Sequence, residues 1–414
     1  MSLSSKRLFK GDPVIWIIYF FLCLISLVEV YSAASSLSYR TGNFLMPLFR
    51  QGAFLLAGTV CAWGFHNIPC RFFRIIPILG GPLAIFLLLI TLISGVTLNG
   101  GSRWLNILGF SFQPSELAKG VVVTAVALCL AQNRTEDGAN PKACKRIVTI
   151  AIVMCGLILT ENLSTAVILA GTVFVMMFIG RVPMRQLGKL LGVCLIAGVI
   201  GLIAVTAIPS STLKELPMLH RAGVWKERLA SHSTQEANDT VFLNEHVQEA
   251  HARIAIASSN IVGKFPGNSE QRDYLPQAFS DFIYAIIIEE MGIFGAVFVA
   301  LLYVILLFRA GRIANRCQRN FPAFLTLGLA ILLVSQAVVN MLVAVGVFPV
   351  TGQPLPLISR GGTSTIFNCV YFGMILSVSR FALRTPEEKK AKAEPAEPEE
   401  EAIENEMQRD DDMN

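Results

Sequence analysis

Charged residues are scarce in this chain. Asp, Glu, Lys and Arg make up 15% of its 414 residues, and hydrophobic residues make up 53%. A soluble domain carries roughly 25% charged residues, so this composition excludes an ordinary soluble protein. Histidine is rarer still, with five residues, and no Cys or His spacing in the sequence suggests a zinc site.

The chain also lacks cysteines where a disulfide framework would need them. Its nine cysteines fall in apolar runs or beside basic clusters, and none lies in a segment that we expect outside the cell. The first apolar run has no small-residue cleavage signature, so we interpret it as a retained span. We find no convincing internal repeat of the kind that many transporters contain.

Long apolar runs are what the chain has in abundance. A helix needs about 20 apolar residues to cross the hydrocarbon core of a bilayer. We count ten such runs, at residues 14–34, 45–65, 74–95, 114–132, 146–161, 164–180, 188–208, 281–308, 321–346 and 358–382. The sequence therefore predicts an all-α, polytopic membrane domain over residues 14–384, preceded by a short cytoplasmic segment, residues 1–13.

The basic residues are divided unequally between the two sides of these runs. One side carries sixteen Lys and Arg residues in the first segment and in the short segments after runs two, four, six and eight. The short loops on the other side carry Arg40, Arg50, Arg103 and Arg360. Cytoplasmic loops are the ones enriched in Lys and Arg. We therefore expect both termini in the cytoplasm.

Two polar stretches lie outside the runs. Residues 209–280, between runs seven and eight, are expected outside the cell, and their length favours a functional loop because connections are usually short. Apolar residues at helical spacing over 247–261 predict an amphipathic helix within this loop. Residues 385–414 contain 12 acids and 4 bases, a composition typical of disorder.

Ionisable residues near the outer side are the candidates for a functional site. Asp281 lies where the long loop meets the eighth run. Glu116 and Lys119 are spaced to pair on one helix face, and such residues inside a membrane are costly. The stretch 349–364, with three prolines and three glycines, is too irregular for a span, so we expect a re-entrant or surface loop that positions Arg360. Adjacent Glu289 and Glu290 are expected to have structural partners.

Four segments resemble the signatures of one known family. They read FQPSELAK (112–119), GNS with YLP (267–276), SDFIYAIIIEEMG (280–292) and PVTGQPLPLISRGGTS (349–364). In this order and on this side of the membrane they resemble the SEDS family, the FtsW and RodA peptidoglycan glycosyltransferases and their sporulation relatives. The resemblance runs from the first to the tenth run.

The chain departs from the family pattern at several positions. Phe279 and Ser280 stand where a His-Thr pair usually precedes the aspartate. Arg360 stands where a Tyr is common, and Asn162 replaces the acid of a Pro-Asp-Leu-Gly-Thr segment. We interpret these differences as marks of a divergent branch. The charged residues that we expect at the site are all present: Arg103, Glu116, Lys119 and Asp281.

The resemblance implies a polymerase of lipid II, the undecaprenyl-pyrophosphate-linked disaccharide peptide. Such an inverting transfer needs a general base for the attacking hydroxyl and charge stabilisation for the leaving group. Asp281 falls on the family's catalytic aspartate, and we expect it to be the base. The expected substrate- or pyrophosphate-binding residues are Arg103, Glu116, Lys119, Ser359 and Arg360. No sequence feature demands a cofactor, although a divalent cation would be compatible.

The loop segment 267–276 is similar to the FtsW-type division branch rather than the RodA-type elongation branch. Implied partners are a class B penicillin-binding transpeptidase, other division proteins and membrane lipid, but no nucleic acid. The implied place is the bacterial inner membrane at the septum. Two rival interpretations stay open: a lipid-linked precursor flippase or transporter without chemistry, and a polymerase or ligase that uses another polyprenyl-linked sugar.

Overall fold

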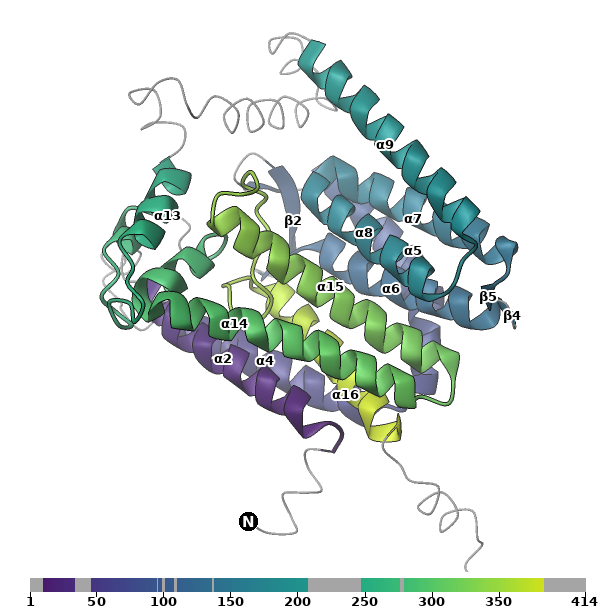
Figure 1. Ribbon diagram of the computed structural model, residues 1–414, viewed down its shortest axis with the longest axis horizontal. Helices are drawn as coiled ribbons and strands as arrows, with labels where there is room; N and C mark the ends of the chain where they lie inside the picture. Colours follow the sequence, from purple (N-terminus) through teal and green to yellow (C-terminus); the bar gives the residue numbers. More distant parts are fainter. Residues whose placement is uncertain are drawn as a thin grey trace, which may run out of the picture.

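The computed structural model describes residues 10–33, 46–94, 96–98, 101–107, 110–135, 138–207, 247–275 and 279–382. Long helices run alongside one another and form a bundle (Figure 1). Those that coincide with the ten predicted runs are α2 (Pro13–Ala33), α4 (Met46–Asn67), α5 (Ile76–Ser94), α6 (Pro114–Gln132), α7 (Pro141–Glu161), α8 (Leu163–Ile179), α9 (Met184–Ala207), α14 (Ile283–Arg316), α15 (Asn320–Ala344) and α16 (Thr363–Ala382).

Eight helices in the described part of the chain are long and apolar enough to cross a membrane. The other two are α8, with 17 residues, and α4, which carries Arg50, Gln51, His66 and Asn67 among its 22 residues. The predicted class, a polytopic helical membrane protein, is confirmed. The count of ten spans stays a prediction. The predicted loop 209–280 also stays a prediction, because most of it lies outside the described residues. Segments 1–9 and 383–414 lie outside them as well.

The eighth run is longer than predicted, because α14 continues to Arg316 rather than ending at residue 308. Arg309 and Arg312 therefore lie on the helix and not in a loop. Arginine is a good helix former, and the Arg309 Nε donates to Asp12 Oδ2 at 3.1 Å. This contact joins the end of α14 to the start of α2.

Short strands qualify the all-α prediction. A three-stranded antiparallel sheet, β1 (Val96–Leu98), β2 (Gly101–Ile107) and β3 (Phe110–Phe112), connects α5 to α6. Leu98 pairs with Gly101 where β1 and β2 meet. A second hairpin joins β4 (Arg134–Thr135) to β5 (Gly138–Ala139). The sheet was missed because β1 and β3 have only three residues each and because β2, GSRWLNI, does not alternate between apolar and polar residues.

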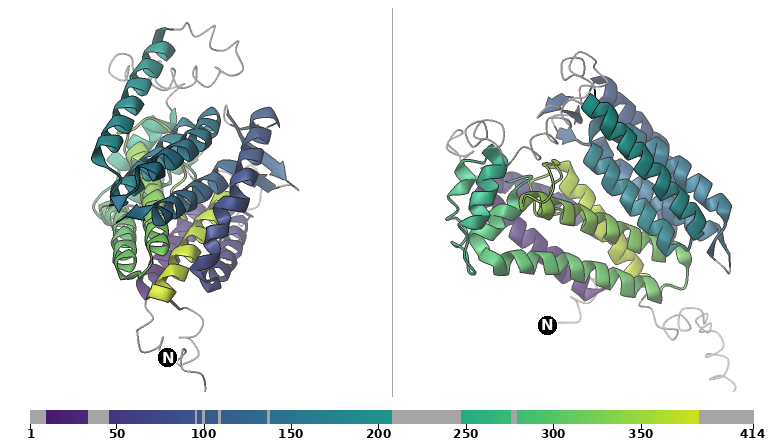
Figure 2. Two further views of the ribbon diagram at one scale, coloured as in Figure 1. Left: turned by 90° about the vertical axis from the view of Figure 1, so that its right-hand side faces the viewer. Right: turned by 45° about the horizontal axis from the view of Figure 1, so that its top comes forward.

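The helices of the bundle differ in how far they are buried. α6 is central, with most of its side chains inside the protein, and it packs against α5 and α15. α16 packs along α4, and α14 along α15. α9 stands apart from the others (Figure 2), and Leu187 is its only buried side chain among those described.

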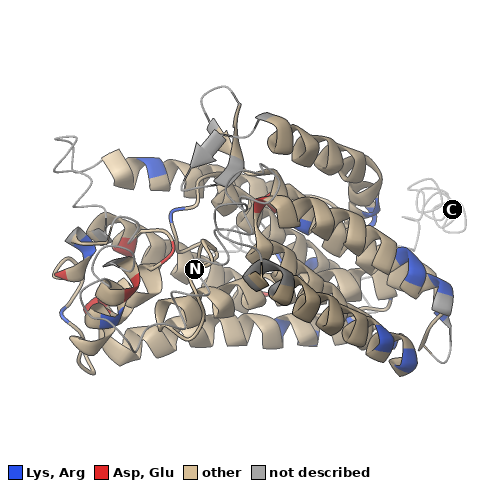
Figure 3. Ribbon diagram, turned by 90° about the horizontal axis from the view of Figure 1, so that it is seen from above, with Lys and Arg blue, Asp and Glu red and all other residues tan. Residues whose placement is uncertain are grey.

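The two ends of the bundle differ in charge. Figure 3 shows Lys and Arg residues spread over one end, whereas the other end carries most of the Asp and Glu residues together with further Lys and Arg residues. This second, mixed end contains α13 (Val247–Ala257), the amphipathic helix that the sequence predicted. Ala252 and Ala255 are buried on its inner face, and α13 contacts α14 and α15. It therefore lies on the bundle at this end.

Candidate active site

The first part of α14 is a short, buried half-helix. Gly292 has φ +66°, which breaks the helical path, so residues 283–291 form one half and the rest of α14 the other. All side chains from Ile283 to Glu290 are buried. At the break, the carbonyl of Glu289 accepts from Lys264 N (2.9 Å) and that of Glu290 from Phe265 N (2.7 Å). The chain of 261–265 thus satisfies backbone groups that the kink leaves free.

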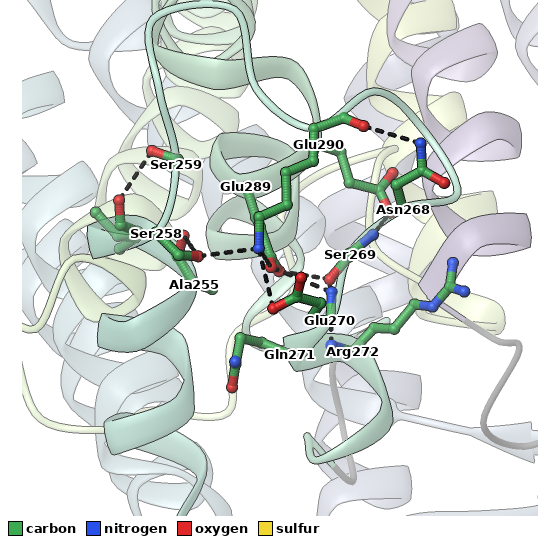
Figure 4. Close-up of polar contacts among 12 residues, drawn as sticks. Ala255, Ser258, Ser259, Asn268, Ser269, Glu270, Gln271, Arg272, Glu289 and Glu290 are labelled. Atoms are coloured by element: carbon green, nitrogen blue, oxygen red, sulfur yellow. Dashed lines mark hydrogen bonds and ion pairs between the residues drawn. The ribbon is translucent and has the colours of Figure 1, made fainter.

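The side chains of Glu289 and Glu290 hold the same segment in place (Figure 4). Glu289 pairs with Lys264 at 3.0 Å and accepts from the hydroxyl of Ser269 at 2.5 Å. Glu290 accepts from the Ser269 N–H (3.3 Å) and from the hydroxyl of Ser32 on α2. The hydrogen bond to Glu289 also raises the pKa of Lys264, which keeps its ammonium charged. The structural role predicted for both carboxylates is confirmed.

Asp281 is half-buried immediately before this half-helix. Its Oδ1 accepts from the hydroxyl of Ser280 at 2.9 Å. Its own carbonyl accepts from Asn340 Nδ2 at 3.0 Å, which fixes the backbone of the carboxylate to α15. Helix N-termini carry a partial positive charge that favours an anion, so the first turn of the half-helix supports an ionised Asp281.

The irregular stretch between α15 and α16 hydrogen-bonds to Phe279 and Ser280, the two residues that precede Asp281. Ser359 Oγ donates to the Ser280 carbonyl at 2.6 Å and accepts from Leu355 N at 2.8 Å. Asn340 Nδ2 also donates to the Gln353 carbonyl, and Gln353 Nε2 to Thr165 Oγ1 of α8. These hydrogen bonds, which include partners on α8 and α15, hold an irregular backbone inside the protein, as membrane depth requires.

Glu116 and Lys119 form a buried ion pair on α6. Lys119 Nζ lies 2.9 Å from Glu116 Oε1, with both side chains almost fully buried. The same ammonium donates to Gln336 Oε1, whose Nε2 donates to the Pro354 carbonyl. The pair that the sequence predicted is confirmed. It is connected through Gln336 to the loop that hydrogen-bonds to the residues before Asp281.

Two guanidinium groups near the irregular loop, those of Arg360 and Arg50, are close enough to repel each other. Arg360 N donates to the Phe279 carbonyl (2.9 Å) and its guanidinium lies 5.1 Å from the centroid of the Phe279 ring. Burial, followed by the like charge of Arg50 on α4, lowers the pKa of Arg360. Among the described residues, neither arginine has an ion pair with Asp or Glu. Two mutually repelling cations of this kind form a place for an anion.

The predicted site residues are thus divided among three settings. Asp281, Ser359 and Arg360 lie together, although both hydrogen bonds of Ser359 are made with backbone groups, the Ser280 carbonyl and the Leu355 N–H. Lys119 and Glu116 are held by each other and by Gln336. Arg103 belongs to β2, but its side chain lies outside the described residues.

Sequence reasoning missed the amides that hold the site together. Gln336 and Asn340 are four residues apart in an apolar span, on one face of α15, and both are almost fully buried. Polar residues in such a setting carry the same signal as charged ones, and this spacing would have identified them. Arg50 was counted only for orientation.

Asn162, which stands where the family has an acid, begins α8. Its Oδ1 accepts from Ser164 N at 3.0 Å and from Thr165 N at 3.5 Å, an N-cap arrangement. Glu161, the residue before it, is buried at the end of α7. The described residues contain no group of three or more His, Cys, Asp and Glu side chains with the arrangement of a metal site.

Fold and site together define a polytopic membrane protein with a carboxylate beside a buried, irregular loop, near two guanidinium groups that have no Asp or Glu partner in the described part of the chain. A family profile described as a cell cycle protein, named for FtsW, RodA and SpoVE, matches residues 13–383. The chain belongs to this family, as the resemblance of its motifs predicted.

Relatives and solved structures agree with this assignment. A probable peptidoglycan glycosyltransferase FtsW of Nitrosococcus halophilus is 32% identical over 91% of this chain and 95% of its own length. Its counterpart in Geobacter metallireducens is 29% identical over 93% and 99%. One chain of a peptidoglycan synthase complex that coordinates polymerisation and crosslinking superposes with a TM-score of 0.70, at 25% identity over 91% of this chain and 99% of that one. RodA of Thermus thermophilus shares the fold, with a TM-score of 0.63 at 23% identity over 91% and 98%.

Proposed function

We propose that this protein polymerises lipid II into glycan strands at the outer face of the cytoplasmic membrane. The family supports a peptidoglycan glycosyltransferase, and the FtsW names of its relatives favour septal synthesis in cell division over elongation. The observation that carries the chemical proposal is the position of Asp281, fixed between a half-helix and a loop that presents Arg360.

The reaction joins two lipid-linked sugars. The 4-hydroxyl oxygen of the acceptor sugar attacks the anomeric carbon of the donor, and the bond between that carbon and the pyrophosphate oxygen breaks. Asp281 accepts the hydroxyl proton, and the undecaprenyl pyrophosphate leaves with the bonding electron pair. A positioned general base contributes about 10²–10⁴-fold.

Arg360 and Arg50 are placed to receive the pyrophosphate. Arginine binds phosphate oxygens in a bidentate manner, and an anion between these two groups relieves their repulsion. The backbone of Arg360 donates a hydrogen bond to the carbonyl of Phe279. Phe279 precedes Asp281 by two residues, so this bond holds Arg360 near Asp281. The proposed base, Asp281, and the proposed pyrophosphate contact, Arg360, therefore lie on two segments that are hydrogen-bonded to each other. Arg103 is proposed as a further pyrophosphate contact.

Glu116 and Lys119 support this arrangement from below. The Lys119 ammonium is buried and donates to Glu116 and to Gln336. We therefore assign the pair first to holding the loop through Pro354, and only through the loop to the substrate. Ser359 acts in the same way, because it fixes the backbone that precedes Arg360.

The protein is an integral membrane protein, and its orientation is part of the proposal. The basic end of the bundle (Figure 3) is assigned to the cytoplasm by the positive-inside rule, and Asp281 to the outer half. A class B penicillin-binding transpeptidase is the proposed partner, because glycan strands need cross-linking. The synthase complex among the solved relatives supports an assembly of this type.

The deciding experiment is an assay of the purified protein with its cognate transpeptidase on lipid II, with glycan polymer as the readout. Polymer from the wild type and none from Asp281→Asn is the expected result. A protein that moves lipid II across a bilayer but forms no polymer would instead identify a flippase.

A further inference from the structure

A cavity lies at the basic end of the bundle, away from Asp281. It has a volume of about 490 Å³ and forms where η1 (Cys70–Ile75), the end of α14, the start of α15 and the end of α16 meet. Pro69, Pro322, Val378 and Phe381 give it apolar walls. No part of the catalytic proposal uses this cavity.

Three arginines make the cavity strongly basic. Arg71, Arg316 and Arg319 line it, all three are exposed, and no Asp or Glu is among the lining residues. In the described part of the chain, none of the three forms an ion pair with a carboxylate. Arg309, on the same helix as Arg316, does form an ion pair, with Asp12. The cavity is a preformed place for several negative charges.

The chain itself carries such charges immediately beyond the cavity wall. Ala382, the last residue of α16, lines the cavity, so the C-terminal segment starts there. Residues 393–408 contain seven Glu and no Lys or Arg, with Ile403 and Met407 as the apolar members. The negative charge of this segment is thus complementary to the arginines of the cavity, and its apolar residues are complementary to the apolar walls.

We propose that the acidic segment 393–408 of this chain returns to the basic end of the bundle and docks in the arginine-lined cavity. Glu399–Glu401 pair with Arg316 and Arg319, and Ile403 enters the apolar part. Sixteen residues, 383–398, connect Ala382 to Glu399, and a flexible linker of that length spans about 20–25 Å on average. Tethering of this kind gives an effective concentration of about 1 mM, so modest exposed ion pairs are sufficient.

An anionic lipid headgroup is the competing occupant, because basic pockets between spans on this side of a membrane bind such lipids. The tail is favoured by its covalent connection to the cavity wall and by its long run of carboxylates. Lipid is present at the same surface in any membrane, so the experiment must vary tail and lipid separately.

Cys317 provides a native probe, since it lines the cavity and is partly exposed. In full-length protein, Cys317 is kept, the other cysteines are replaced by serine, and Glu399→Cys is added. A short bis-maleimide then joins the two thiols in phosphatidylcholine nanodiscs, and mass spectrometry measures the joined peptides. Yields are normalised to the rate at which neutral N-ethylmaleimide labels Cys317, because nearby charge alters thiol reactivity.

Docking predicts that Arg316→Gln with Arg319→Gln lowers the yield at least about threefold, and that 1 M salt does the same by screening exposed charges. Changing the remaining six glutamates of 393–408 to Gln has an equal effect. Arg312→Gln is the matched control, since Arg312 is an exposed arginine of α14 that contacts Phe308 and does not line the cavity. It leaves the yield unchanged.

Equal cross-linking yields in all variants would mean that the tail meets Cys317 only by random collision, and would overturn the proposal. A negligible yield in the parent protein would also overturn it. If the arginine changes instead release phosphatidylglycerol retained by the protein in native mass spectrometry, while the glutamate changes alter nothing, the occupant is lipid. None of these outcomes depends on polymerase activity, so the proposed function stands or falls separately.

Discussion

Gly263 and Gly292 meet at the kink of α14, each with positive φ. A β-carbon on Gly292 would lie 2.6 Å from the nitrogen of Gly263, which is closer than β-carbons approach other atoms. Only glycine combines this backbone conformation with this close approach. The contact joins the segment that carries Lys264 to the half-helix that follows Asp281.

Replacing Gly292 by Ala is expected to destabilise the protein. Positive φ on a non-glycine residue costs of order 1–3 kcal/mol, and the steric overlap adds to that. Thermal unfolding in detergent measures the loss. Gly311→Ala on the same helix is the control, because a β-carbon there has nothing within 4 Å, and its melting temperature should not fall. Equal stability of both variants would contradict the interpretation of the kink.

Asp281→Asn keeps the shape of the side chain and removes the base. We expect glycan polymerisation to fall by at least about 10²-fold, while insertion and binding to the transpeptidase are retained. Matched amounts of wild type and variant on lipid II provide the measurement. Polymer near the wild-type level from Asp281→Asn would move the general-base role to another acid.

Arg360 and Arg50 are expected to act on one shared anion. Single changes to Gln should each slow polymerisation, and the double change should cost less than the sum, with a coupling of about 0.5–3 kcal/mol typical of groups in one network. A double-mutant cycle on the rate with lipid II measures the coupling. Strict additivity would show that the two guanidinium groups serve different parts of the substrate.

Lys119→Met should be more harmful to the fold than removal of both charges. Deleting one partner of a buried ion pair leaves an uncompensated charge and costs about 3–5 kcal/mol. The double variant Glu116→Gln with Lys119→Met leaves no buried charge and should recover part of this stability. Denaturation of the three proteins compares them. Glu116→Gln alone should reduce activity less than Asp281→Asn, since Glu116 acts through Lys119 and Gln336.

The orientation is testable outside the described residues. In a cysteine-free background, cysteines at Ser233 and at Glu399 should react with an impermeant maleimide from opposite sides of the membrane. Reaction of both from the same side would require an odd number of spans, and reaction of the Ser233 position from the cytoplasmic side would remove the site from the outer face.

The sequence was sufficient for the helices because hydrophobicity alone decides which segments enter a bilayer. It also identified the Glu116–Lys119 pair, because helical spacing brings those residues together. The kink at Gly292 could not be predicted, since it depends on a carbonyl and an amide contributed by residues some thirty positions earlier. The roles of Gln336 and Asn340 depend on the path of an irregular loop, which no periodicity specifies. The proximity of Arg50 to Arg360 arises only from the packing of α4 near that loop.

The break in α14 separates the residues that position Asp281 from the residues that contact the substrate. The residues that hold the half-helix, among them Lys264 and Ser269, contact neither sugar nor pyrophosphate in the proposed reaction. Their replacement can shift the position of Asp281 while every substrate contact stays in place. Catalytic rate and substrate preference are therefore separately adjustable in this architecture, and differences in turnover among relatives should follow the sequence of residues 261–269.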